Sequence, residues 1–179
     1  MAHNVLILNS VAAQNVDSWN RSAIIAQDID NGNILSLSSG ISATAGESEV
    51  FTATVPATGT LAGLWMAYEP EVVVTGAQYK GLDPDPRNFF NASGKVFSVF
   101  KPQVGDIVTM TADGLAGTKS SNTFVNATDT TGGVKPLWGS TQTSSVFSMK
   151  LIETTYISIG TGAIADQRIV AYRFEVVGI

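Results

Sequence analysis

Short apolar runs separated by turn residues constrain this chain most, because they leave room for strands and little for helices. The runs are four to eight residues long, and they are rich in Val, Ile, Phe and Thr, which favour strands. Residues 169–177 alternate between apolar and polar side chains, and residues 106–112 alternate in a similar way. A period of two places one face of a strand in the core and the other in solvent. The pattern therefore predicts an all-β protein.

Eight further segments have strand-like composition, and turn residues lie between them. Asn and Gly at residues 30–33 tolerate positive φ, so this segment is predicted to be a hairpin turn. Strands spaced by about 8 to 12 residues are typical of a β-barrel or a β-sandwich. The further predicted strands are residues 5–8, 34–37, 49–55, 64–68, 71–74, 95–100, 146–152 and 156–159.

The pattern as a whole predicts a single β-rich domain over residues 1–179 with little helix. Helix is expected only around residues 16–27 and near 163–167, for a turn or two in each case. Residues 1–46 contain fewer alternating runs, so we expect them to form an N-terminal arm or small subdomain packed on the barrel. The small, polar segment 115–131 is predicted to be a long loop or an exposed hairpin.

Composition excludes several classes of function. The chain has no cysteine and one histidine, so it cannot form a disulfide framework, a thiolate zinc site or a multi-histidine metal site. Ten basic and 15 acidic residues give a net charge of −5. A nucleic-acid-binding protein usually has a basic surface, so this charge argues against binding to nucleic acid. No apolar stretch approaches the ~18 residues that span a bilayer, and the N-terminus lacks a signal peptide's basic region. We expect no cofactor, no metal, no nucleic acid and no membrane partner.

Two glycine-containing motifs are better explained as turns than as ligand sites. Residues 160–165 fit G-x-G-x-x-A, but a dinucleotide site needs a following helix, a second strand and an acid about 20 residues on. The chain ends at Ile179, and the segment after the motif alternates like a strand. Residues 28–32 briefly resemble a calcium loop, yet the glycine is fifth rather than sixth and the twelfth residue is Ser39.

Paired acids raise the hypothesis of an enzyme. Asp83 and Asp85 flank a proline, and a glycosidase on a β scaffold could use two such carboxylates as its acids. Those carboxylates must face each other across a cleft, which neighbours on one extended segment rarely do. Solvated loop acids, with Arg87 as a local partner, are the favoured interpretation. The chain is therefore predicted to have no catalytic residues.

Aromatic side chains suggest an interaction surface. Trp65 lies inside an apolar strand and is expected in the core. Aromatic residues elsewhere are interface anchors when they are exposed, or they could form a sugar-stacking platform. Two adjacent phenylalanines follow a proline-rich loop, an unusual position unless another subunit covers them. The candidate interface residues are Trp19, Phe89, Phe90 and Trp138.

Three stretches of the chain resemble a group of small proteins of tailed bacteriophages that are encoded among the head genes. The first joins MAHNV (residues 1–5) to DIDNGNI (28–34), and the second joins GESEVFTAT (46–54) to EPEV (69–72). The third runs from GKVF (94–97) through VGDIV (104–108) to ADGL (112–115), and the C-terminal RFEVV (173–177) is similar too. The group is thought to decorate capsids, and it brings no catalytic residues with it.

The resemblance implies a non-enzymatic virion protein, made in the host cytoplasm, that binds the outside of the capsid. Its partners would be the major capsid protein and other copies of itself. The oligomeric state is left open, and a trimer is one of the possibilities. Such a protein would stabilise the shell by bridging capsomers, and exposed edge strands would offer docking by strand addition. A phage tail component and a carbohydrate-binding or host-adhesion module remain as alternatives.

Overall fold

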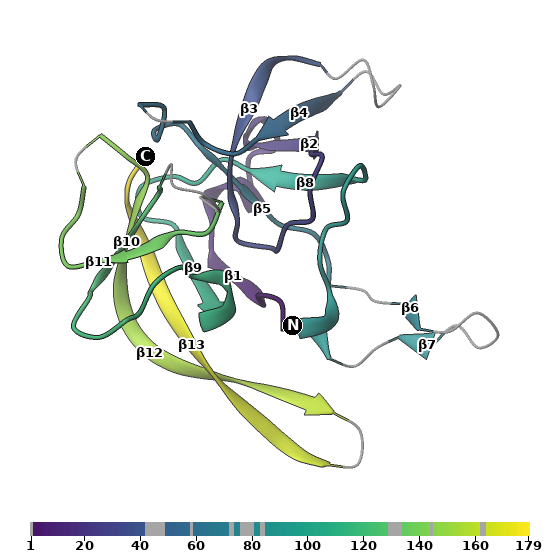
Figure 1. Cartoon of the computed structure of the whole chain (residues 1–179), viewed down its shortest axis with the longest axis vertical. Coiled ribbons are helices and arrows are strands. Elements are labelled where there is room, and N and C mark those ends of the chain that lie inside the picture. The colour runs from purple at the N-terminus through teal and green to yellow at the C-terminus, as the bar shows by residue number, and fades with distance from the viewer. Residues whose placement is uncertain are drawn as a thin grey trace.

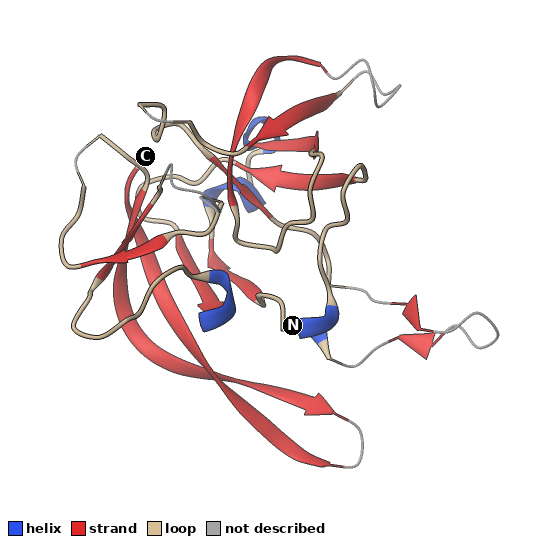
Figure 2. Ribbon diagram, in the orientation of Figure 1, coloured by secondary structure: helices blue, strands red, loops and turns tan. Residues whose placement is uncertain are grey.

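Strands dominate the fold. A computed structural model describes residues 2–41, 49–57, 59–71, 74–75, 81–82, 85–128, 134–143, 145–161 and 164–179. Strands make up 46% of the chain, and no helix in the described ranges reaches seven residues (Figure 2). The all-β prediction is confirmed. In chain order the strands are β1 (Leu6–Ser10), β2 (Asn20–Ile24), β3 (Ile34–Ile41), β4 (Val50–Thr54), β5 (Trp65–Ala67), β6 (Val74–Thr75), β7 (Gly81–Leu82), β8 (Val96–Phe100), β9 (Ile107–Thr111), β10 (Phe124–Asn126), β11 (Leu137–Gly139), β12 (Ser148–Thr161) and β13 (Ile164–Gly178).

The strands form a closed barrel and a separate antiparallel sheet (Figure 1). The barrel has the order β2-β4-β3-β5-β8, and its β2–β4 pair is parallel. The six-stranded sheet has the order β1-β9-β13-β12-β10-β11, and β6 pairs with β7 in a small separate ribbon. Closure removes the exposed edges that an open five-stranded sheet would have.

The N-terminal segment is built into both sheets. Strand β1 pairs with β9 at one edge of the six-stranded sheet, whereas β2 and β3 are barrel strands. The N-terminal segment that we expected to pack as an arm on a barrel therefore supplies strands to both units.

The described structure contains helix in only one of the two segments where the sequence predicted a turn or two of it. In the segment 16–27, a single 3-10 turn at Asp17–Trp19 leads directly into β2, which pairs with β8 over residues 20–24. In the segment 163–167, β13 begins at Ile164 and pairs with β12. The prediction around 16–27 is therefore confirmed only for one 3-10 turn, and the prediction near 163–167 is wrong for the described residues 164–167. Pairing with distant strands outweighs a weak local helix preference.

Two other segments also form more sheet than their sequences suggested. The separate predictions at 146–152 and 156–159 lie in one long strand, β12, which bends at register shifts rather than ending. The segment 115–131 contains β10, whose Val125 is fully buried between β11 and β12. Residues 115–123 form a loop with a single bridge at Ala116, as predicted, whereas residues 124–126 form a sheet strand that the sequence did not predict. The strand predicted at 71–74 lies partly outside the described residues, because residues 72–73 are not described. Val74, at the end of this segment, belongs to β6.

The turn predicted at residues 30–33 is present, but it does not join paired strands. Gly32 has φ of +83°, and Asn33 N–H donates to the Asp30 carbonyl at 3.2 Å. Strand β2, which precedes this turn, pairs with β4 and β8, whereas β3 follows it and pairs with β4 and β5. The hairpin part of the prediction is therefore wrong.

One apolar core joins the barrel to the six-stranded sheet. Ile34, Met66 and Phe100 come from barrel strands, and they share a cluster with Met110 and Phe174 of the sheet. A second cluster, which includes Leu35, Ala53 and Val99, fills the barrel itself. The two units are therefore packed against each other through buried side chains.

Candidate interaction surfaces

The structure separates the four aromatic residues that the sequence suggested as an interface. Trp138 is 8% exposed, and its ring packs against Tyr172 (centroids 5.2 Å apart) and Phe174 (5.5 Å). Trp19 is half-buried against the same core. These two tryptophans therefore contribute to packing, and Trp138 has no free face on which a sugar could stack. Trp65 is half-buried against the core of the barrel.

Phe89 and Phe90 remain near the surface. Phe89 is half-buried, whereas Phe90 is 39% exposed and stacks on the His3 ring at 4.9 Å. The His3 backbone N–H donates to the Arg87 carbonyl at 2.8 Å. His3 Nδ1 lies 2.6 Å from Asp30 Oδ1, so the single histidine ties the N-terminus to two distant loops. This arrangement uses His3 for structure and leaves one face of Phe90 available for contact.

Three asparagines, Asn4, Asn31 and Asn91, and the carboxylate of Glu71 are joined by hydrogen bonds. We call this group the asparagine network. Asn4 Nδ2 donates to the Asn31 carbonyl at 2.6 Å, and Asn4 Oδ1 accepts from the Thr111 N–H and hydroxyl at 3.0 and 2.9 Å. A Cβ at Gly114 would lie 2.3 Å from Asn4 Cγ, so only glycine fits beside this side chain. Asn4 therefore joins the N-terminus to the turn before β3 and to the end of β9.

Asn31 is the hub of this network. Its Nδ2 donates to the Glu69 carbonyl at 2.8 Å and to Glu71 Oε1 at 3.3 Å. Its Oδ1 accepts from Glu69 N–H at 3.0 Å and from Asn91 Nδ2 at 3.2 Å. An asparagine side chain offers two donors and two acceptor sites, and all four are used here. Because its partners belong to the chain itself, the network holds the fold together rather than binding a ligand.

Four of the eight motifs that resemble the phage head proteins meet at this network. Asn4 comes from MAHNV, Asn31 from DIDNGNI, Glu69 and Glu71 from EPEV, and Gly114 from ADGL. These segments are far apart in the chain, yet their side chains and backbones are hydrogen-bonded or in contact. Spacing along the sequence could not reveal this, because the contacts depend on how the two sheets pack.

Of the two carboxylates suggested for catalysis, the structure describes only Asp85. Asp85 accepts from the Arg87 side chain at 2.9 and 2.6 Å and from its backbone N–H at 3.0 Å, as the cap of a 3-10 turn at Pro86–Asn88. The hydrogen bonds from Arg87 lower the pKa of Asp85 below its ordinary value. Asp83 lies outside the described residues. Asp85 is thus held as a turn cap by its neighbour.

Other ligand motifs resolve into turns and strands. Asp28 Oδ1 accepts from Ser93 N–H at 2.7 Å, so this acid of the calcium-like segment caps a neighbouring loop. The G-x-G-x-x-A motif begins at the end of β12 and runs into β13, with residues 162–163 outside the described structure. The described side chains bring no group of three His, Asp or Glu together that could hold a metal ion. No helix of the described chain could cross a membrane.

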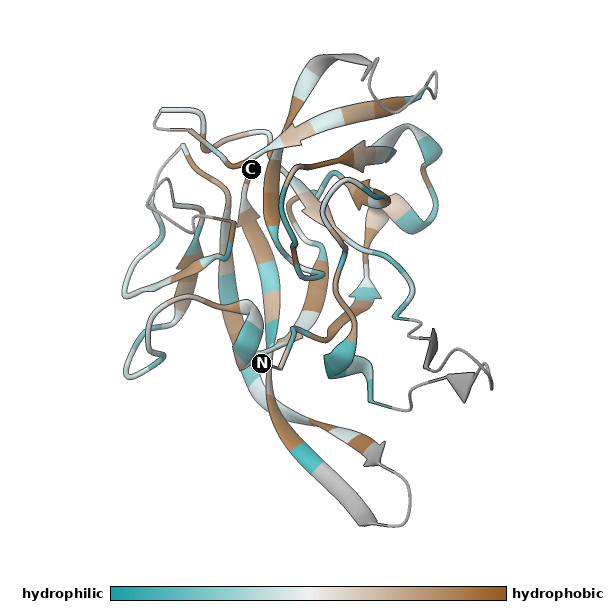
Figure 3. Cartoon of the chain, turned by 45° about the vertical axis from the view of Figure 1, so that its right-hand side comes forward, coloured by the Kyte–Doolittle hydropathy of each residue, from teal (hydrophilic) through white to brown (hydrophobic). Residues whose placement is uncertain are grey.

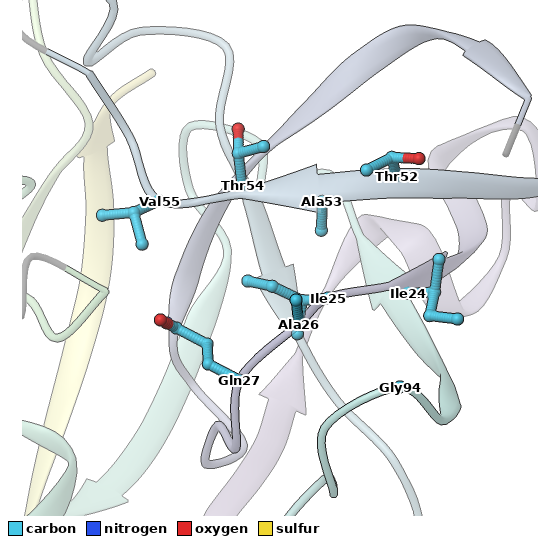
Figure 4. A pocket seen from close by; sticks show the side chains of 9 residues that line it. All are labelled: Ile24, Ile25, Ala26, Gln27, Thr52, Ala53, Thr54, Val55 and Gly94. Carbon is cyan, nitrogen blue, oxygen red and sulfur yellow. The ribbon is translucent and has the colours of Figure 1, made fainter. Parts of the chain in front are cut away.

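An apolar groove of about 500 Å³ opens where β2 and β4 diverge (Figure 4). The two strands pair in parallel only from Ser22↔Val50 to Ile24↔Thr52. No lining side chain is titratable, so the groove offers no acid–base chemistry. Its lining residues are Ile24, Ile25, Ala26, Gln27, Thr52, Ala53, Thr54, Val55 and Gly94.

The long hairpin β12–β13 projects from the body of the molecule (Figure 1). On its β12 side, pairing with the body ends at Leu151, whose N–H donates to the Thr123 carbonyl at 2.8 Å. On its β13 side, pairing with β9 ends at Ala171. We call the part beyond these residues, 152–161 with 164–170, the distal ribbon. Within the described structure, its two strands pair only with each other.

Apolar side chains lie on both faces of the distal ribbon. Tyr156 and Val170 are directly paired across the strands, share one face, and are 53% and 37% exposed. Ile157 and Ile169 are paired on the opposite face and are half-buried. Figure 3 shows apolar segments continuing along this hairpin beyond the body. Strands with apolar residues on both faces are typical of sheets covered on both sides, so the ribbon has the composition of a buried element.

Comparisons with protein-family models, with curated proteins and with solved structures find no match to this chain.

Proposed function

We propose that this chain is a non-enzymatic structural protein of a bacteriophage particle. It binds the outside of the capsid through the major capsid protein and stabilises the shell by bridging capsomers. The distal ribbon is the observation that carries the proposal, because a projecting two-stranded element with apolar residues on both faces needs protein contacts to cover it. Each bridge would bury on the order of 1,000 Å² if it is to be stable.

Two further observations support this function. Three of the resemblance motifs supply Asn4, Asn31 and Glu71 of the asparagine network, so part of what suggests relatedness lies where the N-terminus meets the turn before β3. Trp138, one of the aromatic residues considered for a sugar-stacking platform, is buried and is not available for stacking. A structural role therefore accounts for more of the surface than sugar binding does.

Fractionation of phage particles tests the proposal. Particles that carry this gene are disrupted, heads and tails are separated on a gradient, and the chain is measured in each fraction by mass spectrometry. We expect it in heads at a fixed ratio to the major capsid protein, and we expect added protein to bind shells that lack it. Absence from purified heads would overturn the proposal, and presence in tails alone would replace it with a tail component.

A further inference from the structure

We propose that β12 pairs antiparallel with β12 of a second copy of this chain, around a twofold axis at Tyr156. The proposal concerns self-association and does not depend on binding to a capsid. It starts from the outer edge of β12, which beyond Leu151 is unpaired within the described structure. Most other sheet edges of the described structure are closed, covered or charged, and that difference indicates where a second copy would bind.

The outer edge of β13 beyond Ala171 is also unpaired, but it carries charged residues at Asp166 and Arg168. Apart from this edge and the small β6–β7 ribbon, the sheet edges in the described structure are closed or covered by the chain itself. The barrel has no edge. At the β1 edge of the six-stranded sheet, the outward N–H of Leu6 donates to Glu71 Oε1 at 3.1 Å. At the β11 edge, Trp138 N–H donates to the Ala116 carbonyl at 3.1 Å, and Ala116 N–H donates to the Pro136 carbonyl at 2.9 Å. Covering of this kind is how proteins avoid unwanted strand pairing. The edge of β12 lacks it.

The free edge has the composition of a pairing strand. Register shifts lie between Leu151 and Glu153 and between Ile159 and Thr161, so residues 153–159 form a regular strand between them. This segment reads Glu-Thr-Thr-Tyr-Ile-Ser-Ile. It contains β-branched and aromatic residues, one charge, and neither the proline nor the lysine that usually guards an edge.

The segment is complementary to itself about Tyr156. In a twofold antiparallel pair, Tyr156 meets Tyr156 of the second copy, which is a favourable aromatic cross-strand pair. Thr155 then faces Ile157, and Thr154 faces Ser158. The single charge of the segment, on Glu153, faces Ile159 rather than its own equivalent. No like charges oppose each other in this register, so nothing in the segment resists it.

A second copy also removes the weakness of a two-stranded ribbon. An isolated hairpin is marginally stable in water, whereas three or more strands with an apolar face are stable. Pairing would give a four-stranded sheet in the order β13-β12-β12-β13. Because Val170 is directly paired with Tyr156, the apolar row on that face would run unbroken from one copy to the other. A twofold contact closes on itself and gives a dimer rather than a fibre.

Charge variants at Tyr156, studied in the full-length chain by sedimentation equilibrium, test the pairing. We expect a wild-type dimer that dissociates on dilution. Tyr156→Lys and Tyr156→Glu each place like charges at the axis, and each should raise the dimer Kd by at least about tenfold. An equal mixture of the two variants should recover the dimer, because opposite charges then meet. Val104→Lys, at a residue that is 62% exposed in a loop, is the matched control and should not change the Kd.

Thermal unfolding of each variant shows that the body is intact. Arg168 lies 5.0 Å from the Tyr156 ring, so Tyr156→Glu keeps an attractive partner within the ribbon where Tyr156→Lys does not. A wild-type monomer or trimer, a dimeric Tyr156→Lys variant, or a mixture that stays monomeric would overturn the proposal. A dimer that fails to bind capsids would instead count only against the proposed function.

Discussion

At the scale of single residues, the asparagine network decides much of the stability. Asn31 is fully buried, and its side chain makes four hydrogen bonds to three residues, Glu69, Glu71 and Asn91. Buried polar groups that lose their partners cost about 1–3 kcal/mol each, which is more than the net gain from forming a typical hydrogen bond. The cost of removing Asn31 therefore comes mainly from the groups that are left unsatisfied.

Asn31→Ala should lower the free energy of unfolding by about 3 kcal/mol, since it leaves the Glu69 backbone and Asn91 without partners. Urea unfolding followed by circular dichroism measures this. Asn122→Ala is the control, because the Asn122 side chain donates an exposed hydrogen bond to the Thr118 carbonyl, and its backbone bond to Lys119 is kept in the variant. That variant should change the free energy by no more than about 0.5 kcal/mol. Equal losses in the two variants would contradict the role of the network.

Glu71 gives the stability a dependence on pH. Burial raises the pKa of Glu71 above its ordinary value of 4.5, although hydrogen bonds from Leu6 N–H and Asn31 act in the opposite direction. The folded chain therefore holds this proton more tightly than the unfolded chain. The stability that this group contributes is fully present below pH 4.5, and it is lost as pH rises through the raised pKa.

Glu71→Gln should flatten that pH dependence, because glutamine keeps the acceptor oxygen and removes the buried charge. Unfolding free energies measured from pH 4 upward should fall less steeply in this variant than in the wild type. Glu153→Gln removes the same charge from an exposed ion pair with Arg173, and it serves as the matched control. If the free energy of unfolding of Glu71→Gln fell with pH as steeply as that of the wild type, another group would be responsible for the pH dependence.

At the scale of elements, the hairpin β12–β13 has two parts with different roles. Near the body, β12 pairs with β10 and β13 pairs with β9, and Phe174 and Met149 are fully buried in the core. Beyond Leu151 and Ala171 the strands support only each other. The proximal part belongs to the fold, whereas the distal ribbon is available for association.

Replacing residues 156–170 with Asn-Gly should leave the body folded and remove association. Thr155 and Ala171 are directly paired, so a two-residue turn fits between them. We expect the melting temperature to stay within a few degrees of the wild-type value, and we expect the shortened chain to be monomeric by light scattering. An unfolded product would mean that the distal ribbon is part of the core. A product that still dimerises would place the self-contact elsewhere.

At the scale of the whole molecule, the barrel and the sheet share one core. Met66 of β5 and Met110 of β9 are fully buried in the same cluster, and the Phe147 N–H donates to the Leu61 carbonyl at 2.7 Å. Removing either unit would expose the apolar face of the other. The two units should therefore unfold together.

A single unfolding transition is the expected outcome. Tryptophan fluorescence reports on Trp65 in the barrel and on Trp138 in the sheet, whereas far-ultraviolet circular dichroism reports on all strands. The two signals should coincide in urea. Met66→Ala should shift both by the same amount, with a loss of about 2–5 kcal/mol. Two separated transitions would mean that the barrel and the sheet are independent.

The sequence determined the elements whose pattern is local. Alternation at residues 106–112 and strand-like composition at residues 95–100 predicted β9 and β8 to within a residue at each end, because both signals are local to the strand. Gly32 marked its turn for the same reason, since positive φ is a local requirement.

Only the tertiary structure decided which strands pair and which side chains are buried. It made residues 20–24 a barrel strand, took Trp138 into the core and brought Asn4 to Thr111, 107 residues away. It also left the edge of β12 uncovered, although the strand itself reads much like its neighbours. Each of these outcomes depends on contacts between segments far apart in the chain, where a local pattern carries no information about the partner.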